Sequence, residues 1–143
     1  MRYPAISDYA LIGDCHSAAL VSRAGSVDWC CFHRFDARPV FGRVLDWDRG
    51  GFFQISPRRL ERTARRYLPG TNVLESRYET SSGALSVIDC MPVQGRGEDP
   101  PAATQPHPHH QLLRMLRCEG GEVDVGIELR PRFDYGRTVP RME

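Results

Sequence analysis

The stretch that decides the fold is residues 73–89, which read VLESRYETSSGALSVID. The polar segment Thr80–Gly83 is flanked by two β-rich runs, Val73–Glu79 and Leu85–Asp89. Ser and Gly are turn residues, and Gly supplies the positive φ that tight turns need. This pattern predicts an antiparallel hairpin.

The same pattern of two β-rich runs around turn residues recurs on both sides of that hairpin. Three further pairs of short β-rich runs surround turn residues: Ala18–Ser22 with Val27–Phe32, Phe41–Leu45 with Phe52–Ser56, and Leu112–Arg117 with Val123–Leu129. In the last run apolar and polar residues alternate, which predicts one buried and one solvated face. The run Leu60–Tyr67 fits a helix or a strand. Many short strands with regular turns predict an all-β, antiparallel β-sandwich.

Composition narrows the class of protein. The chain has 143 residues with 41% apolar and 26% charged residues, which suits one globular domain with a hydrophobic core. A net charge of +1 is too small to attract nucleic acid or an anionic membrane electrostatically. No apolar run approaches the roughly 20 residues of a membrane span, and Met1–Pro4 does not resemble a signal peptide. We therefore expect a cytoplasmic protein that binds neither nucleic acid nor membrane.

The cysteines and histidines raise the question of metal or disulfide chemistry. Five cysteines without a Cys-x-x-Cys pair predict free, mostly buried thiols: Cys15, Cys30, Cys31, Cys90 and Cys118. Three histidines, His107, His109 and His110, end a Gly-, Pro- and Ala-rich segment, residues 94–110. We expect that segment to be a flexible loop between two strands. Because its histidines lack paired cysteine spacing, we expect no metal and no cofactor.

Several sequence blocks resemble a known family. They are residues 12–23 (IGDCHSAALVSR), 25–29 (GSVDW), 34–36 (RFD), 66–75 (RYLPGTNVLE), 87–92 (VIDCMP) and 129–136 (LRPRFDYG). In this order they resemble the N-terminal region of the trehalase-like and glucoamylase-like proteins of glycoside hydrolase family 15. The resemblance spans nearly the whole chain. One departure is His33, where the family usually carries Pro.

The resemblance implies an N-terminal β-sandwich followed by an (α/α)6 barrel. In that barrel two Glu residues hydrolyse α-glucosidic bonds with inversion, which needs carboxyls about 6.5–9.5 Å apart. Neither Glu has a counterpart here, and the family's sandwich runs about as far again beyond Gly136. Residues 1–143 are thus expected to be a partial sandwich, a non-catalytic scaffold for an enzyme acting on trehalose or maltooligosaccharides.

The implied partners are the missing barrel or the second half of the sandwich, and an α-glucoside. A half sandwich leaves open edges, so the isolated chain should be marginally stable, self-associate or need the missing half. A stand-alone carbohydrate-binding or protein-interaction module is the alternative, because sandwich folds host many functions.

Four residues are candidates for contact with substrate or with the barrel: Arg34, Asp36, Trp29 and Asp14. On an extended segment Arg34 and Asp36 share one side, where they can form fixed hydrogen bonds to sugar hydroxyls or to a barrel loop. An ion pair that only fixes the loop explains them equally well. Trp29 packs in the core or against a sugar.

Other polar residues receive structural interpretations. Asp14 precedes Cys15 and His16, which on a strand would point to opposite faces, so a buried Cys beside a surface His is expected rather than a nucleophile with its base. Asp28 and Asp89 interrupt apolar runs, and we expect each to find a partner. The arginines of residues 58–66 predict a solvated face or an interdomain contact rather than a site for nucleic acid.

Overall fold

The computed structural model describes residues 3–94 and 107–141. Apart from one 3-10 turn (η1, Ile6–Asp8), the regular elements in these residues are strands. They are β1 (Tyr9–Gly13), β2 (Ala18–Ser22), β3 (Ser26–Cys30), β4 (Phe41–Gly42), β5 (Phe52–Pro57), β6 (Arg62–Tyr67), β7 (Leu74–Glu79), β8 (Gly83–Cys90), β9 (Val93–Gln94), β10 (His107–Pro108), β11 (Leu113–Gly121) and β12 (Val125–Arg130).

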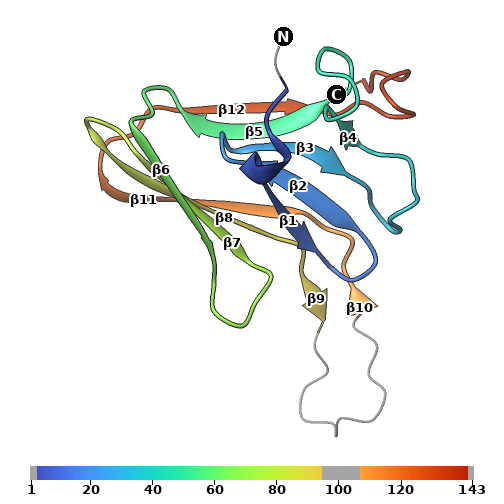
Figure 1. The fold of residues 1–143 in the computed structure, drawn as a ribbon, viewed down its shortest axis with the longest axis horizontal. Helices are drawn as coiled ribbons and strands as arrows, with labels where there is room; N and C mark the ends of the chain where they lie inside the picture. Colours follow the sequence, from blue (N-terminus) through green and yellow to red (C-terminus); the bar gives the residue numbers. More distant parts are fainter. Residues whose placement is uncertain (1–2, 95–106, 142–143) are drawn as a thin grey trace, which may run out of the picture.

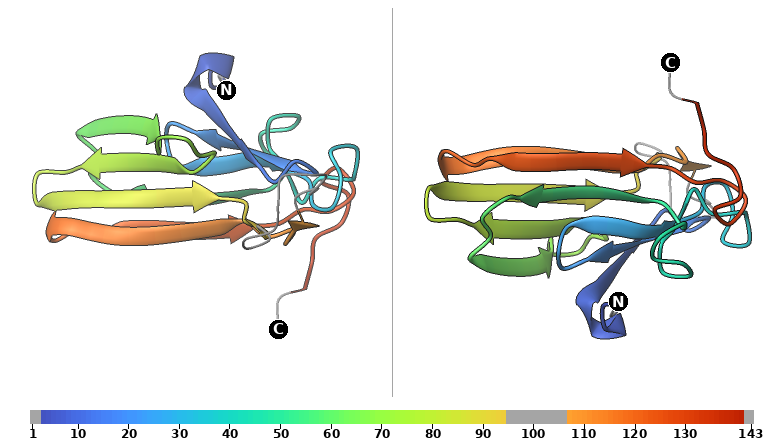
Figure 2. Two further views of the ribbon diagram at one scale, coloured as in Figure 1. Left: turned by 90° about the horizontal axis from the view of Figure 1, so that it is seen from below. Right: turned by 90° about the horizontal axis from the view of Figure 1, so that it is seen from above.

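Two sheets pack face to face (Figure 1). One has the order β1-β2-β3-β5-β12, with β4 attached to β3, and the other has the order β11-β8-β7-β6. Every pairing is antiparallel. The last two strands lie at the same side of the two layers, opposite the N-terminus (Figure 2). The predicted antiparallel β-sandwich is confirmed.

Two predicted hairpins form as expected, β2–β3 and β7–β8. The turn between β2 and β3 depends on Gly25, which has φ +84°. A Cβ atom there would lie 2.1 Å from the Ile55 carbonyl oxygen, so only Gly lets β5 approach this turn. Ile55 donates its backbone N–H to the Gly25 carbonyl at 3.0 Å, which ties the turn to β5.

Two other predicted hairpins are wrong. Strands β11 and β12 follow each other but pair with β8 and β5, so the chain crosses from one sheet to the other. Strand β4 pairs with β3 rather than with β5. Both hairpins were predicted because the two strands of each pair follow each other in the sequence. In the structure these strands pair instead with other strands. Within the ambiguous run Leu60–Tyr67, residues 62–67 form β6, and each of them pairs with a residue of β7.

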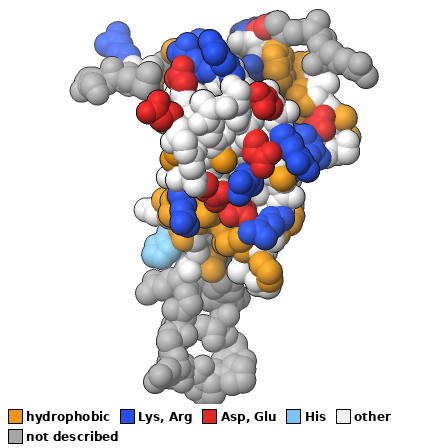
Figure 3. Space-filling model, turned by 90° about the vertical axis from the view of Figure 1, so that its left-hand side faces the viewer, with side chains coloured by type: hydrophobic (Ala, Val, Ile, Leu, Met, Phe, Trp, Pro, Cys, Tyr) orange, Lys and Arg blue, Asp and Glu red, His pale blue; other side chains and the backbone are white. Residues whose placement is uncertain are grey.

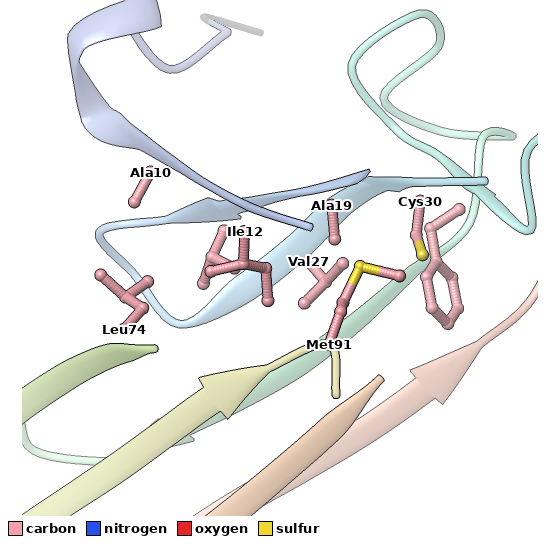
Figure 4. Packing of buried hydrophobic residues seen from close by; sticks show 9 residues of the cluster. Ala10, Ile12, Ala19, Val27, Cys30, Leu74 and Met91 are labelled. Carbon is pink, nitrogen blue, oxygen red and sulfur yellow. The ribbon is translucent and has the colours of Figure 1, made fainter. Parts of the chain in front are cut away.

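The core is densest between β1, β2 and β3 on one sheet and β7 and β8 on the other. Ile12 and Val27 are fully buried there and face Leu74 and Met91 across the layers (Figure 4), and the equally buried Val21 belongs to the same cluster. A second cluster joins Ile55 to three residues of the other sheet, Tyr78, Leu85 and Val87. Alternation along each strand places these residues on one face, which is why they meet.

A buried ion pair fastens the two layers together. Arg114 on β11 donates from Nε and Nη2 to the two carboxylate oxygens of Asp89 on β8, at 2.7 and 3.2 Å. Its guanidinium also reaches the opposite sheet, where it donates to the carbonyls of Phe53 at 2.6 Å and Gly25 at 3.0 Å. Both side chains are only 1% exposed. Because both charges are fully partnered, this pair links the layers.

The side of the sandwich formed by β11 and β12 is open. Ile127 pairs with the buried Ile55, and Leu116 pairs with the buried Val87, so both side chains are on the core-facing side of their strands. Nevertheless Ile127 is 61% exposed and Leu116 is 40% exposed. The predicted burial of one face of the last strand is therefore wrong for Ile127 and Leu129, since neither layer covers them.

Three remaining predictions concern the surface and the thiols. Within the segment predicted to be a flexible loop, residues 95–106 lie outside the described residues, and its flanks pair as β9 and β10. All five cysteines are free, but Cys15 and Cys118 are exposed and only Cys30 and Cys31 are buried, which corrects the expectation of mostly buried thiols. No helix among the described residues has the length and apolar character of a membrane span.

Candidate functional site

Three segments that are distant in sequence meet where β1 turns into β2 and β3 leads toward β4 (Figure 1). They contribute Asp14, His33 and His110. The His110 Nδ1 atom lies 3.7 Å from Asp14 Oδ2, and the His33 and His110 rings are 4.6 Å apart between centroids. His16 lies slightly farther, with its ring centroid 6.1 Å from that of His110. We refer to Asp14, His16, His33 and His110 as the end cluster.

Local chemistry positions Asp14. Its Oδ1 atom accepts hydrogen bonds from the backbone N–H of His16 at 3.0 Å and from the N–H and hydroxyl of Ser17 at 2.6 and 3.0 Å. This is the Asx-type turn that Asp favours between strands. Gly13 fits beside it because a Cβ would lie 2.7 Å from the Ser17 carbonyl oxygen. The turn fixes the carboxylate in a buried position, 1% exposed.

The second oxygen of this carboxylate is unusual. Asp14 Oδ2 and His110 Nδ1 are buried, and neither finds a hydrogen-bond partner among the residues that the structure describes. Burial raises the pKa of Asp14, but the hydrogen bonds from Ser17 and His16 and the charge of His110 outweigh it, so the pKa lies below its ordinary value. A buried carboxylate oxygen without a donor is costly. It can accept a hydrogen bond from a ligand or another segment.

Arg34 and Asp36 form a bidentate ion pair beside the cluster. Arg34 Nε and Nη2 donate to the two oxygens of Asp36 at 2.8 and 2.9 Å. The hydrogen bond from Arg34 lowers the pKa of Asp36. The segment is a turn, closed by Ala37 N–H donating to the Arg34 carbonyl at 3.1 Å, so the expected extended conformation is wrong. Both side chains are more than 70% exposed.

A shallow cavity of about 260 Å³ joins the pair to the cluster. It is lined by His16, His33, Arg34, Phe35 and Asp36. Phe35 is 60% exposed, so the cavity offers an aromatic face next to hydrogen-bond donors and acceptors. Such a surface suits polar contacts with a sugar or with a protein loop.

The structure brings together only three of the four residues that the sequence proposed as contacts for substrate or the barrel. Asp14, Arg34 and Asp36 lie at this end, whereas Trp29 does not line the cavity. Trp29 is half-buried and pairs with Leu20, which places it on the sheet face opposite the core. Cys15 is exposed in a loop with φ +68°, so the expected buried Cys is wrong.

The sequence pointed to the cluster through Asp14, a candidate contact residue, and through the unusual His33. His33 has φ +70°, which the ring of Pro forbids, so this backbone conformation requires a residue other than Pro. His110 was noted only as one of three histidines at the end of a loop, and the sequence did not link it to Asp14, because strand pairing alone brings the two together. Within residues 3–94 and 107–141, no group of three or more His, Cys, Asp and Glu side chains is arranged to hold a metal ion.

Two of the five arginines in residues 58–66 form ion pairs with acidic side chains. Arg66 pairs with Glu75 at 2.6 Å and Arg58 with Asp124 at 3.4 Å. Arg65 instead donates to the carbonyls of Asp8 and Val21. On the face seen in Figure 3, basic and acidic side chains are interspersed. A solvated, charge-balanced face agrees with this arrangement better than a track for a phosphate backbone.

Comparison with known proteins identifies the family. A family model described as "Trehalase-like, N-terminal" matches residues 2–143. The chain belongs to this family. It is 39% identical to a trehalase of Mycolicibacterium smegmatis and 38% identical to a trehalase of Mycobacterium tuberculosis, over 99% and 94% of its length. A trehalase of Thermoplasma volcanium is 30% identical over 99% of it.

The matches cover only part of each relative. The chain spans only about a fifth of their length, 22%, 21% and 22% respectively. The resemblance to a trehalase-like N-terminal region is therefore confirmed, and the matched region of each relative is followed or preceded by a much longer remainder. No solved structure matches the chain.

Proposed function

We propose that this chain is the non-catalytic N-terminal part of a trehalase-type glycoside hydrolase of family 15, in which it supports an (α/α)6 catalytic domain. That domain would hydrolyse the α-glucosidic bond of trehalose or of maltooligosaccharides with inversion. The observation that carries the proposal is the family match over residues 2–143 together with three trehalases that are each about five times longer.

The open side of the sandwich supports this role. Strands β11 and β12 are the end strands of their sheets, so each has backbone donors and acceptors with no neighbouring strand in the described structure. Core-facing Leu116, Ile127 and Leu129 are exposed between them. A surface that combines strand edges with apolar side chains suits further strands, which would complete the hydrogen bonds and bury the side chains. The proposed occupant is the remainder of the parent polypeptide.

The end cluster supplies a second contact in this proposal. Asp14 Oδ2 is buried and unpartnered in the described residues, and the Arg34–Asp36 pair stands exposed beside it. A loop of the catalytic domain, or a substrate hydroxyl, could donate to Asp14 and exchange hydrogen bonds with the pair. The pair would then position a loop near the substrate pocket without taking part in bond cleavage.

A chimera tests the function. The first fifth of the Mycolicibacterium smegmatis trehalase is replaced by this chain, and release of glucose from trehalose is measured. The proposal expects a folded chimera that hydrolyses trehalose. A chimera that folds, as judged by a cooperative melt, but does not hydrolyse trehalose would contradict it.

Two equally exposed residues make a matched pair for the docking surface. In the chimera Ile127→Lys introduces a charge on the open side, and Leu45→Lys introduces one on the loop after β4; the wild-type side chains are 61% and 60% exposed. Docking at the open side predicts loss of soluble, active chimera for the first variant and not for the second. Equal activity of the two variants would overturn this docking surface.

A further inference from the structure

A second cavity lies on the outer face of the larger sheet, remote in structure from the end cluster. Its volume is about 390 Å³, which is in the range of small-molecule sites. Asp28 and Gln54 form part of its floor, Arg43 and Trp47 one wall, and Pro4 of the N-terminal segment another. The N-terminal segment is held there by Tyr3, whose hydroxyl accepts the backbone N–H of Trp47 at 3.2 Å.

The floor is a preorganised carboxylate. Asp28 is the extra residue of a β-bulge, because Leu20 pairs with Trp29 and Val21 with Val27. The bulge turns Asp28 toward the outer face, where Tyr9 donates to Oδ2 at 2.8 Å and Ser26 donates to Oδ1. Burial and the hydrogen bond to Asp28 raise the pKa of Tyr9, which keeps its hydroxyl a donor.

The wall is an arginine held flat between two rings. The guanidinium carbon of Arg43 lies 4.0 Å from the ring centroid of Trp47 and 3.9 Å from that of Phe52. Nη1 is 3.8 Å from Asp28 Oδ1, longer than a hydrogen bond. Nε is buried and has no hydrogen-bond partner among the described residues. The stacking fixes the orientation of the guanidinium N–H groups of Arg43, and its Nε–H remains able to donate a hydrogen bond.

We propose that this cavity binds a neutral, polyhydroxylated ligand, a sugar of disaccharide size. A hydroxyl both donates and accepts, so it can bridge the buried carboxylate and the fixed guanidinium, which no purely anionic or cationic group does. A nearby second pair, Arg23 and Asp8 at 3.7 Å, keeps the rim charge-balanced as well. Trp47 adds an aromatic surface for the C–H face of a sugar. The preference for an α-glucoside among sugars rests on the proposed function.

An anion is the competing ligand, and the geometry disfavours it. A phosphate group near Arg43 would also lie near the buried charge of Asp28, and like charges in a partly desolvated cavity repel. Neutral sugars carry no such cost. Binding should therefore be insensitive to salt, in contrast to binding of an anion.

The experiment uses this chain labelled with ¹⁵N and follows its two indole N–H signals by NMR. Trehalose, maltose, cellobiose and inorganic phosphate are titrated in separate runs. We expect a saturable shift of the Trp47 signal with at least one disaccharide, unchanged in higher salt. The Trp29 signal serves as an internal control and should not move. The assignment is made with a Trp29→Phe variant.

Two variants keep the test decisive if one fails to fold. Arg43→Gln removes the stacked cation, and Gln54→Ala removes a floor side chain whose only described hydrogen bond is to Ser56. Each should weaken binding, Arg43→Gln by roughly tenfold or more, as expected for one charge-assisted hydrogen bond. Arg59→Gln, an exposed arginine outside this cavity, should change nothing.

The outcomes separate this proposal from the proposed function, because no hydrolysis is measured. Saturable binding of a neutral disaccharide that Gln54→Ala weakens supports the cavity even if the chimera is inactive. Binding only of cellobiose overturns the α-glucoside preference and leaves the sugar site standing. No saturable shift with any sugar, a shift with phosphate alone, or equal binding by Gln54→Ala overturns the site.

Discussion

Ile55 and Ile127 lie opposite each other in the register of β5 and β12 and point to the same face, yet they have opposite environments. Ile55 is 1% exposed and packs against Tyr78, Leu85 and Val87 of the other sheet. Ile127 is 61% exposed. Isoleucine on one face of one sheet is thus buried in the core on the closed side of the sandwich and exposed to solvent on the open side. Burial is decided by what lies across the layers.

The largest expected effect concerns the ion pair that links the layers near the open side. Arg114→Met leaves the Asp89 carboxylate buried without a cation, so we expect the free energy of unfolding to fall by about 3–5 kcal/mol. Urea denaturation of the two proteins measures the loss. The double variant Arg114→Met/Asp89→Leu should recover a large part of it. A loss below about 1 kcal/mol in the single variant would mean that this ion pair contributes little to holding the two layers together.

The neighbouring isoleucines provide the direct test of the comparison. Ile55→Ala opens a cavity in the core and should cost about 2–5 kcal/mol, whereas Ile127→Ala should change the stability by about 0.5 kcal/mol or less. The measurement is the urea midpoint of each variant at a protein concentration low enough for the chain to be monomeric. Similar losses in the two variants would show that Ile127 is buried within the monomer and would contradict the comparison.

Self-association is expected because of the same surface. Leu116, Ile127 and Leu129 form an exposed apolar row that is rimmed by strand edges. Sedimentation velocity should detect oligomers of the isolated chain, and Ile127→Lys should reduce them more than Leu45→Lys. A strictly monomeric wild-type chain that melts cooperatively would contradict this expectation.

A smaller effect is expected at Asp14. Because its folded-state pKa is lowered, its contribution to stability is present above the unfolded pKa, about 3.9, and is lost as the pH falls through the folded pKa. Asp14→Asn should cost about 1 kcal/mol near neutral pH and remove part of the acid dependence. Urea midpoints between about pH 3 and pH 7 measure this. An unchanged acid dependence would contradict the role of the carboxylate.

The smallest effect on stability is expected at Asp36, whose ion pair with Arg34 is largely exposed to solvent. Asp36→Ala should leave the urea midpoint unchanged, because exposed pairs contribute little. In the chimera it should nevertheless lower trehalose hydrolysis by roughly tenfold, if the pair contacts the catalytic domain or substrate. Arg58→Ala breaks an equally exposed pair elsewhere, that of Arg58 with Asp124, and is the control. Matching activities of the two variants would show that the Arg34–Asp36 pair only stabilises its own loop.

Sequence patterns predicted much of the fold because they depend on local physics. Alternation of apolar and polar residues marked the strands, and Gly25 marked the turn whose closeness to β5 admits no side chain. The expectation that Asp28 and Asp89 find partners holds, since a buried carboxylate requires them. The family blocks also identified the trehalase-like N-terminal region, which the match over residues 2–143 confirms.

Only the tertiary structure decided which strands pair and which apolar faces are covered. Strand β12 has the alternation of a half-buried strand, and pattern alone cannot tell that its pairing partner is β5 and that no layer covers Ile127. The end cluster has the same origin: His110 reaches Asp14 because β11 pairs with β8, a contact between residues far apart in the chain. Local preference fixes the strand, but long-range pairing chooses its neighbours and therefore its environment.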